Sequence, residues 1–469
     1  MESRYRGPRT LLRPALLASL LAMALGTSAQ TPVQWQSNSA PRSNAGTPTA
    51  PRTFVNTAQR APAVDRGMAY LPPPNQVQPL ASSFDVRRVE LMAQALVANQ
   101  RIPGLAVAIV KDGKILSARG YGITDVKAAE PVDAHTVFRL ASLSKSFAGT
   151  LTGMLVSEGA LRWDSKIVDY MPTLQFSNPA AAQDLTVAEV LSHRVGLTHN
   201  AFDRDIEGYA EYRDVVRRFS SAPMKCQPGT CYAYQNVAFS LVGDVVYAAS
   251  GQFYNEAVAS RIFKPLGMDD ASMGLEGIQA SPRWAKPHVR GGGGWTSLMP
   301  KPTYYRVSPA AGVNASISDM AQWLLAQGGH RPDVLPQPLL ATLHAPVVTT
   351  PGELRGSAWR RERLNGAGYG LGWRVYDYAG HRVVFHGGAV QGYRGAIALM
   401  PEKDLGIAIL WNSESSLPSG LMPTILDSAI GLPYQAWLKV DVPGDQPETM
   451  YAGHAPAGVE TSTSTAAPE

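Results

Sequence analysis

The stretch Phe138-Arg139-Leu140-Ala141-Ser142-Leu143-Ser144-Lys145-Ser146-Phe147 contains the motif around which the rest of the sequence can be arranged. Ser142 and Lys145 are three residues apart, and on a helix this spacing places two side chains on one face. A lysine beside a serine hydroxyl helps to remove its proton and so activates a weak nucleophile. If Ser142 also lies at a helix N-terminus, the free backbone N–H groups favour developing negative charge there.

The Ser-x-x-Lys pair is a weak signal by itself, because about one chance match is expected in a chain of this length. On the motif alone, a surface serine and lysine without a catalytic role is the more common explanation. The motif gains weight only from what accompanies it elsewhere in the sequence.

The composition bounds the class of protein. The chain has 469 residues, of which 45% are apolar and 17% charged, as in a globular protein with a large core or two lobes. Four arginines and one glutamate in the first 29 residues account for three of the five net positive charges. The remaining charge gives no argument for nucleic acid or an anionic membrane as a partner.

Residues 1–29 have the pattern of a secretory signal: an Arg-bearing start, an apolar run over 14–26, and the small residues Thr27-Ser28-Ala29. The apolar run is too short for a comfortable membrane span, although an uncleaved N-terminal anchor is the competing interpretation. No other stretch approaches about 18 uninterrupted apolar residues. We therefore expect a periplasmic or secreted protein without stable membrane insertion after the signal is cleaved.

The rest of the chain divides by composition into three parts. Residues 30–83 are rich in Pro, Ala, Ser, Thr, Asn and Gln and predict a flexible linker. Residues 84–437 predict the folded domain, and residues 438–469 predict a disordered tail.

Within the domain, hydrophobic periodicity predicts the elements. Asp112-Gly113 between two short apolar runs predicts a β-hairpin. Helices are predicted over 84–100, 147–159, 185–197, 238–250, 317–327 and 421–430, and strands over 105–110, 115–121, 370–376, 382–385, 395–400 and 405–411.

Strands from both ends of the domain predict one antiparallel sheet flanked by helices, an α/β (α+β) fold. The mostly helical middle, about residues 160–330, predicts a second lobe. Ser142 follows the first strands, so we expect it at the seam between the lobes, where ligand clefts are common.

The two cysteines, Cys226 and Cys231, enclose Gln-Pro-Gly-Thr, a turn that can bring them together. An exported compartment permits a disulfide, which we expect to hold the loop leading to Tyr234; two free thiols are the alternative. Two cysteines without histidines placed to join them as ligands argue against a metal site. No cofactor is predicted.

Tyr234-Gln235-Asn236 is the second candidate for chemistry. A tyrosine near a lysine can act as a general base if positive neighbours stabilise its phenolate, because its ordinary pKa is about 10. Asn236 offers an amide donor and acceptor for orienting a substrate. A turn tyrosine beside a helix-capping asparagine is the structural alternative.

The third candidate is His386-Gly387-Gly388-Ala389, which follows a predicted strand. The two glycines let a substrate backbone approach closely, and the backbone N–H of Ala389 can serve an oxyanion beside that of Ser142. His386 can bind a carboxylate if protonated, or form a hydrogen bond if neutral. A glycine-rich bulge with an incidental histidine is the alternative. His193, which precedes Gly196, we expect to be a structural hydrogen-bonding residue.

Ser142-x-x-Lys145, Tyr234-x-Asn236 and His386-Gly387-Gly388 together resemble, in order and rough spacing, the motifs of the serine penicillin-recognising enzymes. The chain most resembles the class C β-lactamase branch, which includes D-alanyl-D-alanine carboxypeptidases, D-aminopeptidases and carboxylesterases. Two further short motifs are similar to those of this family: Leu191-Ser192-His193 and Pro265-Leu266-Gly267-Met268. The resemblance covers about residues 84–435 and implies a β-lactamase/transpeptidase-like fold.

The resemblance also implies roles for individual residues. Ser142 would be the acylated nucleophile, Lys145 its proton partner, and Tyr234 the general base or relay. Asn236 would orient the substrate, and the backbone N–H groups of Ser142 and Ala389 would form the oxyanion hole.

His386-Gly387-Gly388 stands where class C β-lactamases usually carry Lys-Thr-Gly, and it lacks the lysine charge and the threonine hydroxyl that help to bind the substrate carboxylate. We expect His386 to tune substrate choice rather than acylation itself.

Three hypotheses about the function follow. The first is an exported serine hydrolase acting on β-lactams or D-amino-acid peptides. The second is a carboxylesterase of the same fold, and the third a non-catalytic binding protein. Either enzyme would take a small-molecule or peptide substrate; the sequence does not give the oligomeric state. The sequence contains neither Gly-x-Ser-x-Gly nor His-Glu-x-x-His, which argues against an α/β-hydrolase and a zinc hydrolase.

Overall fold

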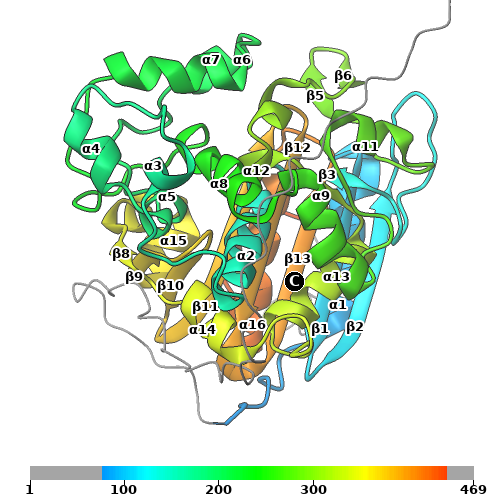
Figure 1. The fold of residues 1–469 in the computed structure, drawn as a ribbon. Helices are drawn as coiled ribbons and strands as arrows, with labels where there is room; N and C mark the ends of the chain where they lie inside the picture. The colour runs from blue at the N-terminus through cyan, green and yellow to red at the C-terminus, as the bar shows by residue number, and fades with distance from the viewer. Residues whose placement is uncertain (1–75, 441–469) are drawn as a thin grey trace, which may run out of the picture. The chain divides into compact units, whose positions relative to one another are not determined.

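The computed structural model describes residues 76–440, and their centre is an eight-stranded antiparallel sheet (Figure 1). The predicted signal, most of the predicted linker and most of the predicted tail lie outside the described residues. In spatial order the strands are β2 (Lys114–Gly122), β1 (Gly104–Lys111), β13 (Leu405–Trp411), β12 (Tyr393–Met400), β11 (His381–Val390), β10 (Arg374–Tyr378), β9 (Leu364–Tyr369) and β8 (Val348–Thr349).

The sheet joins the two ends of the domain, as predicted. The hairpin β1–β2 turns at Asp112-Gly113, and β1 pairs with β13 so that Leu105 lies opposite Trp411. Strand β1 is buried on both faces because successive side chains enter different cores. Val107 belongs to one apolar cluster and Ala108 to the other.

Helices cover both faces of the sheet. On one face lie α1 (Val86–Val97) and α16 (Leu421–Ile430), whose apolar side chains pack with Val107. On the other lie α2 (Ser144–Ser157) and α13 (Ile317–Gln327). Asp85 caps α1 by accepting the N–H of Arg87, and Ser316 forms a capping box with Asp319 at the start of α13.

The middle of the chain is mostly helical, as predicted, with two small sheets, β3 (Phe138–Arg139), β7 (Val313–Ala315) and β4 (Ser272–Met273), and β5 (His288–Gly291) and β6 (Gly294–Ser297). The remaining helices are α3 (Ile167–Tyr170), α4 (Pro179–Asp184), α5 (Val187–Leu191), α6 (Asp203–Glu207), α7 (Tyr212–Arg217), α8 (Leu241–Ser250), α9 (Tyr254–Val258), α10 (Lys264–Leu266), α11 (Gly274–Ala280), α12 (Ser308–Ala311), α14 (Gln337–Leu343) and α15 (Ala358–Arg363). Within residues 76–440, no helix combines the length and apolarity needed to cross a bilayer.

Three predicted elements are wrong in extent. The strand predicted over 382–385 extends from His381 to Val390, so it contains His386 instead of ending before it. The helix predicted over 185–197 ends at Leu191, because His193 adopts a left-handed backbone (φ 59°) that breaks the helical path. The strand predicted over 370–376 begins only at Arg374. Its first residues form a turn in which Gly372 has φ 87° and passes close to α2.

Residues 76–83, in the predicted linker, are held against the domain. The N–H of Ala81 donates to the carbonyl of Ala429, and Lys403 Nζ donates to the carbonyl of Pro79.

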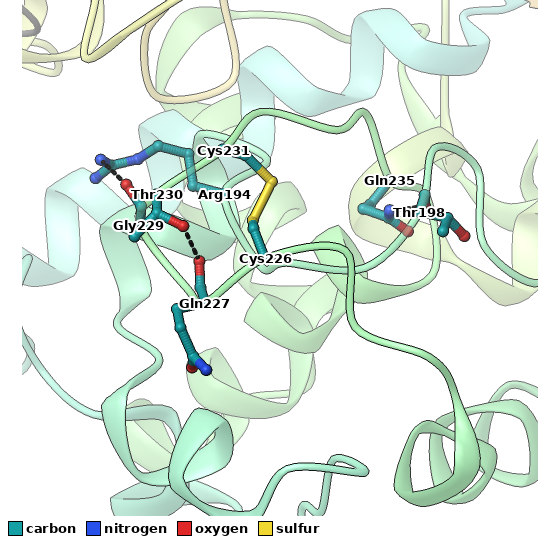
Figure 2. Close-up of a disulfide and its surroundings, with 8 residues drawn as sticks. All are labelled: Arg194, Thr198, Cys226, Gln227, Gly229, Thr230, Cys231 and Gln235. Atoms are coloured by element: carbon teal, nitrogen blue, oxygen red, sulfur yellow. Dashed lines mark hydrogen bonds between the residues drawn. A yellow bond between two sulfur atoms is a disulfide. The ribbon is translucent and has the colours of Figure 1, made fainter.

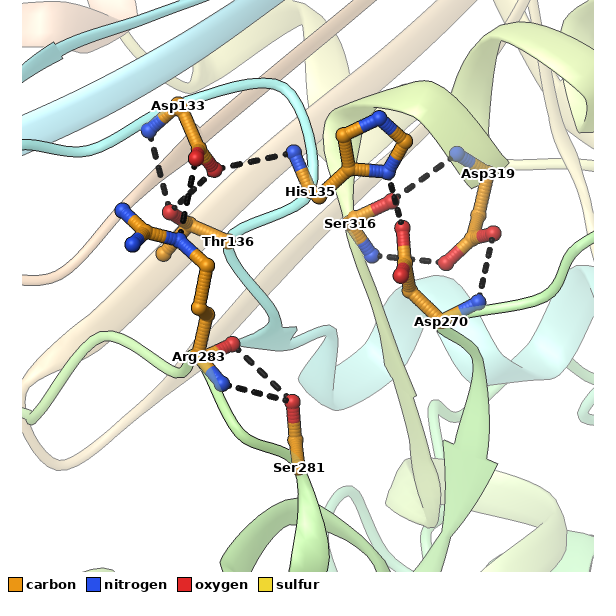
Figure 3. Close-up of polar contacts among 8 residues, drawn as sticks. All are labelled: Asp133, His135, Thr136, Asp270, Ser281, Arg283, Ser316 and Asp319. Atoms are coloured by element: carbon orange, nitrogen blue, oxygen red, sulfur yellow. Dashed lines mark hydrogen bonds and ion pairs between the residues drawn. The ribbon is translucent and has the colours of Figure 1, made fainter.

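A polar cluster surrounds the chain segment that leads into β3 (Figure 3). Asp133 accepts hydrogen bonds from the hydroxyl of Thr136 and the N–H of His135, and it pairs with Arg283. The His135 ring contacts Asp270, whose own N–H donates to Asp319 at the start of α13. These contacts fix the approach of β3, from which the chain turns directly into the Ser142 segment.

Cys226 and Cys231 form a disulfide, as expected (Figure 2). The loop that it closes is hydrogen-bonded in both directions to the segment after α5: Arg194 Nη1 donates to the carbonyl of Gly229, and the N–H of Gly229 donates to the carbonyl of Arg194. Tyr234 lies three residues after Cys231, so the cross-link anchors the loop segment that carries the Tyr234 side chain.

We predict that replacing both cysteines by serine lowers the free energy of unfolding by about 2 kcal/mol, the chain-entropy value for a ring this small. Chemical denaturation with and without dithiothreitol measures it: reductant should destabilise the wild type to the same extent and leave the double variant unchanged. A wild type whose midpoint ignores complete reduction would show that the bond adds no stability.

Candidate active site

Ser142 lies where the chain turns from β3 into α2. The N–H of Leu140 donates to Val313 of β7, and the 3-10 turn Ala141–Leu143 then leads into the helix. Ala141 has φ 50°, a left-handed conformation that costs a residue with a β-carbon about 1–2 kcal/mol. Ser142 lies in this turn, two residues before α2 begins, so the expected helix N-terminus is present. The strained residue Ala141 directly precedes the serine.

Lys145 is fully buried, and its side-chain nitrogen, Nζ, is surrounded by three oxygen atoms. Nζ lies 3.4 Å from Ser142 Oγ, 2.7 Å from Asn236 Oδ1 and 3.1 Å from the carbonyl oxygen of Ala310. Burial lowers the pKa of Lys145 well below its usual value; Asp203 raises this pKa and Arg374 lowers it further. Nζ donates to all three oxygens, and its lowered pKa favours loss of one of these protons, after which the amine can accept the proton of Ser142.

Two glycines allow the turn before β10 to lie directly against helix α2. A β-carbon on Gly149 would lie 2.1 Å from the carbonyl oxygen of Leu371, and one on Gly372 would lie 2.3 Å from that of Lys145. Any side chain at either position would push the lysine-bearing helix away from the turn before β10.

Tyr234 brings its ring to the same place. Lys145 Nζ lies 4.7 Å from the ring centroid, and Ser142 forms a hydrogen bond with the Tyr234 hydroxyl. Burial raises the pKa of Tyr234, against the lowering effects of Arg374 and of the bond with Ser142. The tyrosine is therefore a neutral hydroxyl at ordinary pH, able to donate and accept a proton in a relay.

His193 supports Tyr234 from behind. Its Nδ1 accepts the N–H of Gln235, and its ring centroid lies 4.2 Å from that of Tyr234. Burial lowers the pKa of His193 well below its usual value, so the ring is neutral. This confirms the expectation of a structural hydrogen-bonding residue.

Asn236 is fixed from both sides. Its Oδ1 accepts from Lys145, and its Nδ2 donates to Asp203 Oδ2 over 2.7 Å. The amide is thus oriented by two partners, with its oxygen toward the lysine.

Gly387, Gly388 and Ala389 belong to β11 and line the same cavity as Ser142, with a volume of about 510 Å³. A β-carbon on Gly388 would lie 2.5 Å from the carbonyl oxygen of Leu140 and 3.3 Å from Ser142 N, so glycine is required for this approach. The proximity fits an oxyanion hole between the two segments, and the role of the Ala389 N–H stays a prediction.

His386 is placed differently from its neighbours. Its ring is fully buried and is not among the residues lining the cavity. Nδ1–H donates to the carbonyl of Gly387 over 2.8 Å, and Nε2 accepts the hydroxyl of Tyr369 over 3.1 Å. Burial, with Arg374 and Lys145 nearby, lowers the pKa of His386 well below its usual value. The ring is therefore neutral with both nitrogens engaged, and any effect on substrate choice has to be indirect.

Several cavity residues were not found from the sequence. Arg374 of β10 lies 5.3 Å from the Tyr234 ring centroid and pairs with Glu353, which also pairs with Arg360. Asp203 lies at the start of α6, and Trp359 on α15. Isolated charged and aromatic residues far apart in the sequence carry no spacing signal, so only their convergence identifies them.

In the described part of the chain, no three His, Cys, Asp or Glu side chains are grouped so that they could hold a metal ion. The chemistry that this arrangement offers is a serine nucleophile activated by a buried amine.

Comparisons with known proteins show which family and fold the chain resembles. Among curated relatives, a D-aminopeptidase of Gluconobacter oxydans is 28% identical over 369 residues, which cover 76% of this chain and 64% of the relative. Unguisins hydrolase ungD' of Aspergillus campestris is 26% identical over 335 residues, covering 69% of this chain and 61% of the relative. The chain thus spans somewhat less than two thirds of the length of both.

The solved structure of the octameric penicillin-binding protein homologue from Pyrococcus abyssi has a TM-score of 0.66 and 25% identity, over 76% of this chain and 79% of that one. This confirms the predicted fold, whereas the finer resemblance to the class C branch stays a prediction. A family model described as Beta-lactamase matches residues 89–430, which include every predicted site residue. The chain therefore belongs to the Beta-lactamase family.

Proposed function

We propose that this protein is an exported serine hydrolase that forms an acyl-enzyme on Ser142 and acts on β-lactams or D-amino-acid peptides. The observation that carries the proposal is the fully buried Lys145, whose Nζ is held by Asn236 and Ala310 at 3.4 Å from Ser142 Oγ. Membership of the family supports a hydrolase. Export to the periplasm or beyond rests on the signal pattern of residues 1–29.

Acylation begins when Ser142 Oγ attacks the substrate carbonyl carbon and its proton passes to Lys145 Nζ. Two backbone N–H groups, of Ser142 and Ala389, stabilise the oxyanion. The Tyr234 hydroxyl, which is hydrogen-bonded to Ser142, then relays this proton from Lys145 to the leaving nitrogen as the amide bond breaks. A water molecule then attacks the ester carbonyl and gives its proton to Lys145 Nζ. Lys145 passes this proton to Ser142 Oγ as the ester C–O bond breaks, which releases the acid and restores the enzyme.

Two observations support an amide or lactam substrate that carries a carboxylate. Arg360, Arg374 and Arg394 line the cavity, and the single charge of Glu353 is shared between Arg360 and Arg374, so net positive charge remains. The relative named D-aminopeptidase and the neighbour named a penicillin-binding protein homologue support an amide or lactam as the substrate.

A carboxylesterase is the second candidate, and one observation favours it. His386 is buried and neutral, and residue 387 is a glycine. The strand therefore supplies neither the lysine charge nor the threonine hydroxyl that usually help a β-lactamase to bind its substrate.

We predict that benzylpenicillin adds covalently to the wild type and that Ser142→Ala abolishes the adduct, while the exposed Ser220→Ala retains it. Intact mass followed over time measures this. A long-lived adduct indicates a penicillin-binding peptidase, and a transient one with ring-opened product indicates a β-lactamase. Lys145→Met should slow acylation about a thousandfold, because it removes the proton acceptor.

The absence of an adduct together with Ser142-dependent cleavage of simple esters would favour the esterase. If Ser142→Ala left the cleavage of every ester, amide and lactam unchanged, the acyl-enzyme proposal would be wrong, and absence of all cleavage would favour a binding protein.

The rate of acylation should rise with pH along a limb set by Lys145, because the protonated form has no lone pair for Ser142. The Asp203 charge favours the ammonium, so Asp203→Asn should move this limb to lower pH. The Arg374 charge disfavours it, so Arg374→Gln should move the limb to higher pH. Arg355→Gln, which removes an exposed charge elsewhere, serves as the control.

The measurement is kcat/KM for an ester at closely spaced pH values. If Asp203→Asn and Arg374→Gln shifted the pH dependence of kcat/KM in the same direction, a group other than Lys145 would determine the rise of the rate with pH.

A further inference from the structure

Asp203 is a buried carboxylate in the wall of the cleft. It is the first residue of α6, is only 9% exposed, and lines the same cavity as Ser142. Oδ2 accepts from Asn236 Nδ2 over 2.7 Å and from the Tyr304 hydroxyl over 3.3 Å. Among the described residues, Oδ1 has no hydrogen-bond partner. A buried carboxylate oxygen without a partner is rare and calls for an explanation.

No cation of the described chain neutralises this carboxylate by direct contact. None of the ion pairs among residues 76–440 includes Asp203, and Lys145 reaches it only through the amide of Asn236. Lys145 is also the neutral amine when it acts on Ser142. Burial raises the pKa of Asp203, so a cation bound beside it would stabilise the charged form.

The cleft is therefore charged differently on its two walls. The helical wall carries Asp203, with Tyr304 and Asn236 around it. The wall formed by α15 and the sheet carries Arg360, Arg374 and Arg394. A substrate with one ammonium and one anionic group, such as a short peptide with free ends, matches this arrangement.

The position of Asp203 indicates which part of the substrate carries the ammonium. Asp203 is joined through Asn236 to Lys145, and Lys145 contacts Ser142. Since both residues line one cavity, an ammonium bound at Asp203 can belong to the part of the substrate next to the carbonyl that Ser142 attacks. The α-amino group of the residue that becomes the acyl group has this relation to its own carbonyl.

We propose that Asp203 binds the free α-ammonium group of the substrate's N-terminal residue, which makes the site selective for amino-terminal amides over N-acylated ones. This inference rests on the proposed acyl-enzyme at Ser142. The reaction is then removal of one N-terminal amino acid: the peptide C–N bond breaks, the new amine takes a proton, and water releases the acyl residue.

The experiment compares D-alanine p-nitroanilide with N-acetyl-D-alanine p-nitroanilide, and the same pair in the L series. For the wild type we expect kcat/KM for the free amine to exceed that for the acetylated compound by about 30-fold or more, the size of effects at desolvated charge pairs. In Asp203→Asn this ratio should fall close to one. Any effect of the substitution on Lys145 applies to both compounds and cancels in the ratio.

Asp205→Asn is the matched control, because it makes the same change two residues away in α6. Asp205 pairs with Arg218 and does not line the cavity, so the ratio should persist. Asp203→Glu keeps the charge and should retain most of the preference. Calorimetry of Ser142→Ala with D-alaninamide and N-acetyl-D-alaninamide needs no change at Asp203, and only the first should bind.

The outcomes separate this inference from the proposed function. Ser142-dependent cleavage with a wild-type ratio near one, or a ratio that survives Asp203→Asn, would overturn the role of Asp203 and leave the acyl-enzyme intact. Failure of Ser142→Ala to discriminate the two amides would overturn it independently of turnover. If neither anilide is cleaved and no adduct forms on Ser142, both proposals are overturned together.

Discussion

The removal of Lys145 from water is the constraint on which the rest of this site depends. Burying an ammonium ion costs on the order of several kcal/mol, so the side chain is stabilised by giving up its proton and placing its N–H groups on fixed acceptors. Asn236 Oδ1 and the carbonyl of Ala310 are those acceptors. The lowered pKa of Lys145 favours the neutral amine, which is the state that a proton acceptor requires.

The fold maintains this burial by close packing around α2. Gly149 and Gly372 let the turn before β10 touch the helix backbone, and the small sheet β3–β7–β4 fixes the entry of the chain. The disulfide loop and the His193 ring hold Tyr234 over the lysine. Helical and sheet segments therefore meet at one buried nitrogen, and none of them alone would exclude water from it.

The electrostatics of the cleft differ from what the motifs suggest. The histidine that replaces the usual lysine on β11 is neutral and turned toward Tyr369, so it adds no charge to the cavity. Permanent positive charge comes instead from Arg374 on the neighbouring strand, and negative charge from Asp203 on the helical wall. Since both charges act on Lys145, the groups lining the cleft also influence the protonation state of this amine.

The sequence by itself determined the strongly periodic elements and the local motifs. The hairpin at Asp112-Gly113, helices α2 and α13, and the strands around Leu405 were all predictable, because turn chemistry and apolar periodicity act over a few residues. Ser142, Lys145, Tyr234 and Asn236 stand in short local motifs, and the order of these motifs along the chain, which resembles a known family, singled them out. The end of α5 was missed because a single left-handed residue, His193, overrides a helical pattern.

Only the tertiary structure decided the burial of His386, the charge supplied by Arg374 and the unpartnered oxygen of Asp203. These properties depend on contacts between residues far apart in the chain, such as Asp203 with Asn236 and Tyr369 with His386. Desolvation is likewise a property of everything packed around a group. A sequence pattern can name candidates for a nucleophile and its base, but the charges that face the cavity are set by packing between distant segments.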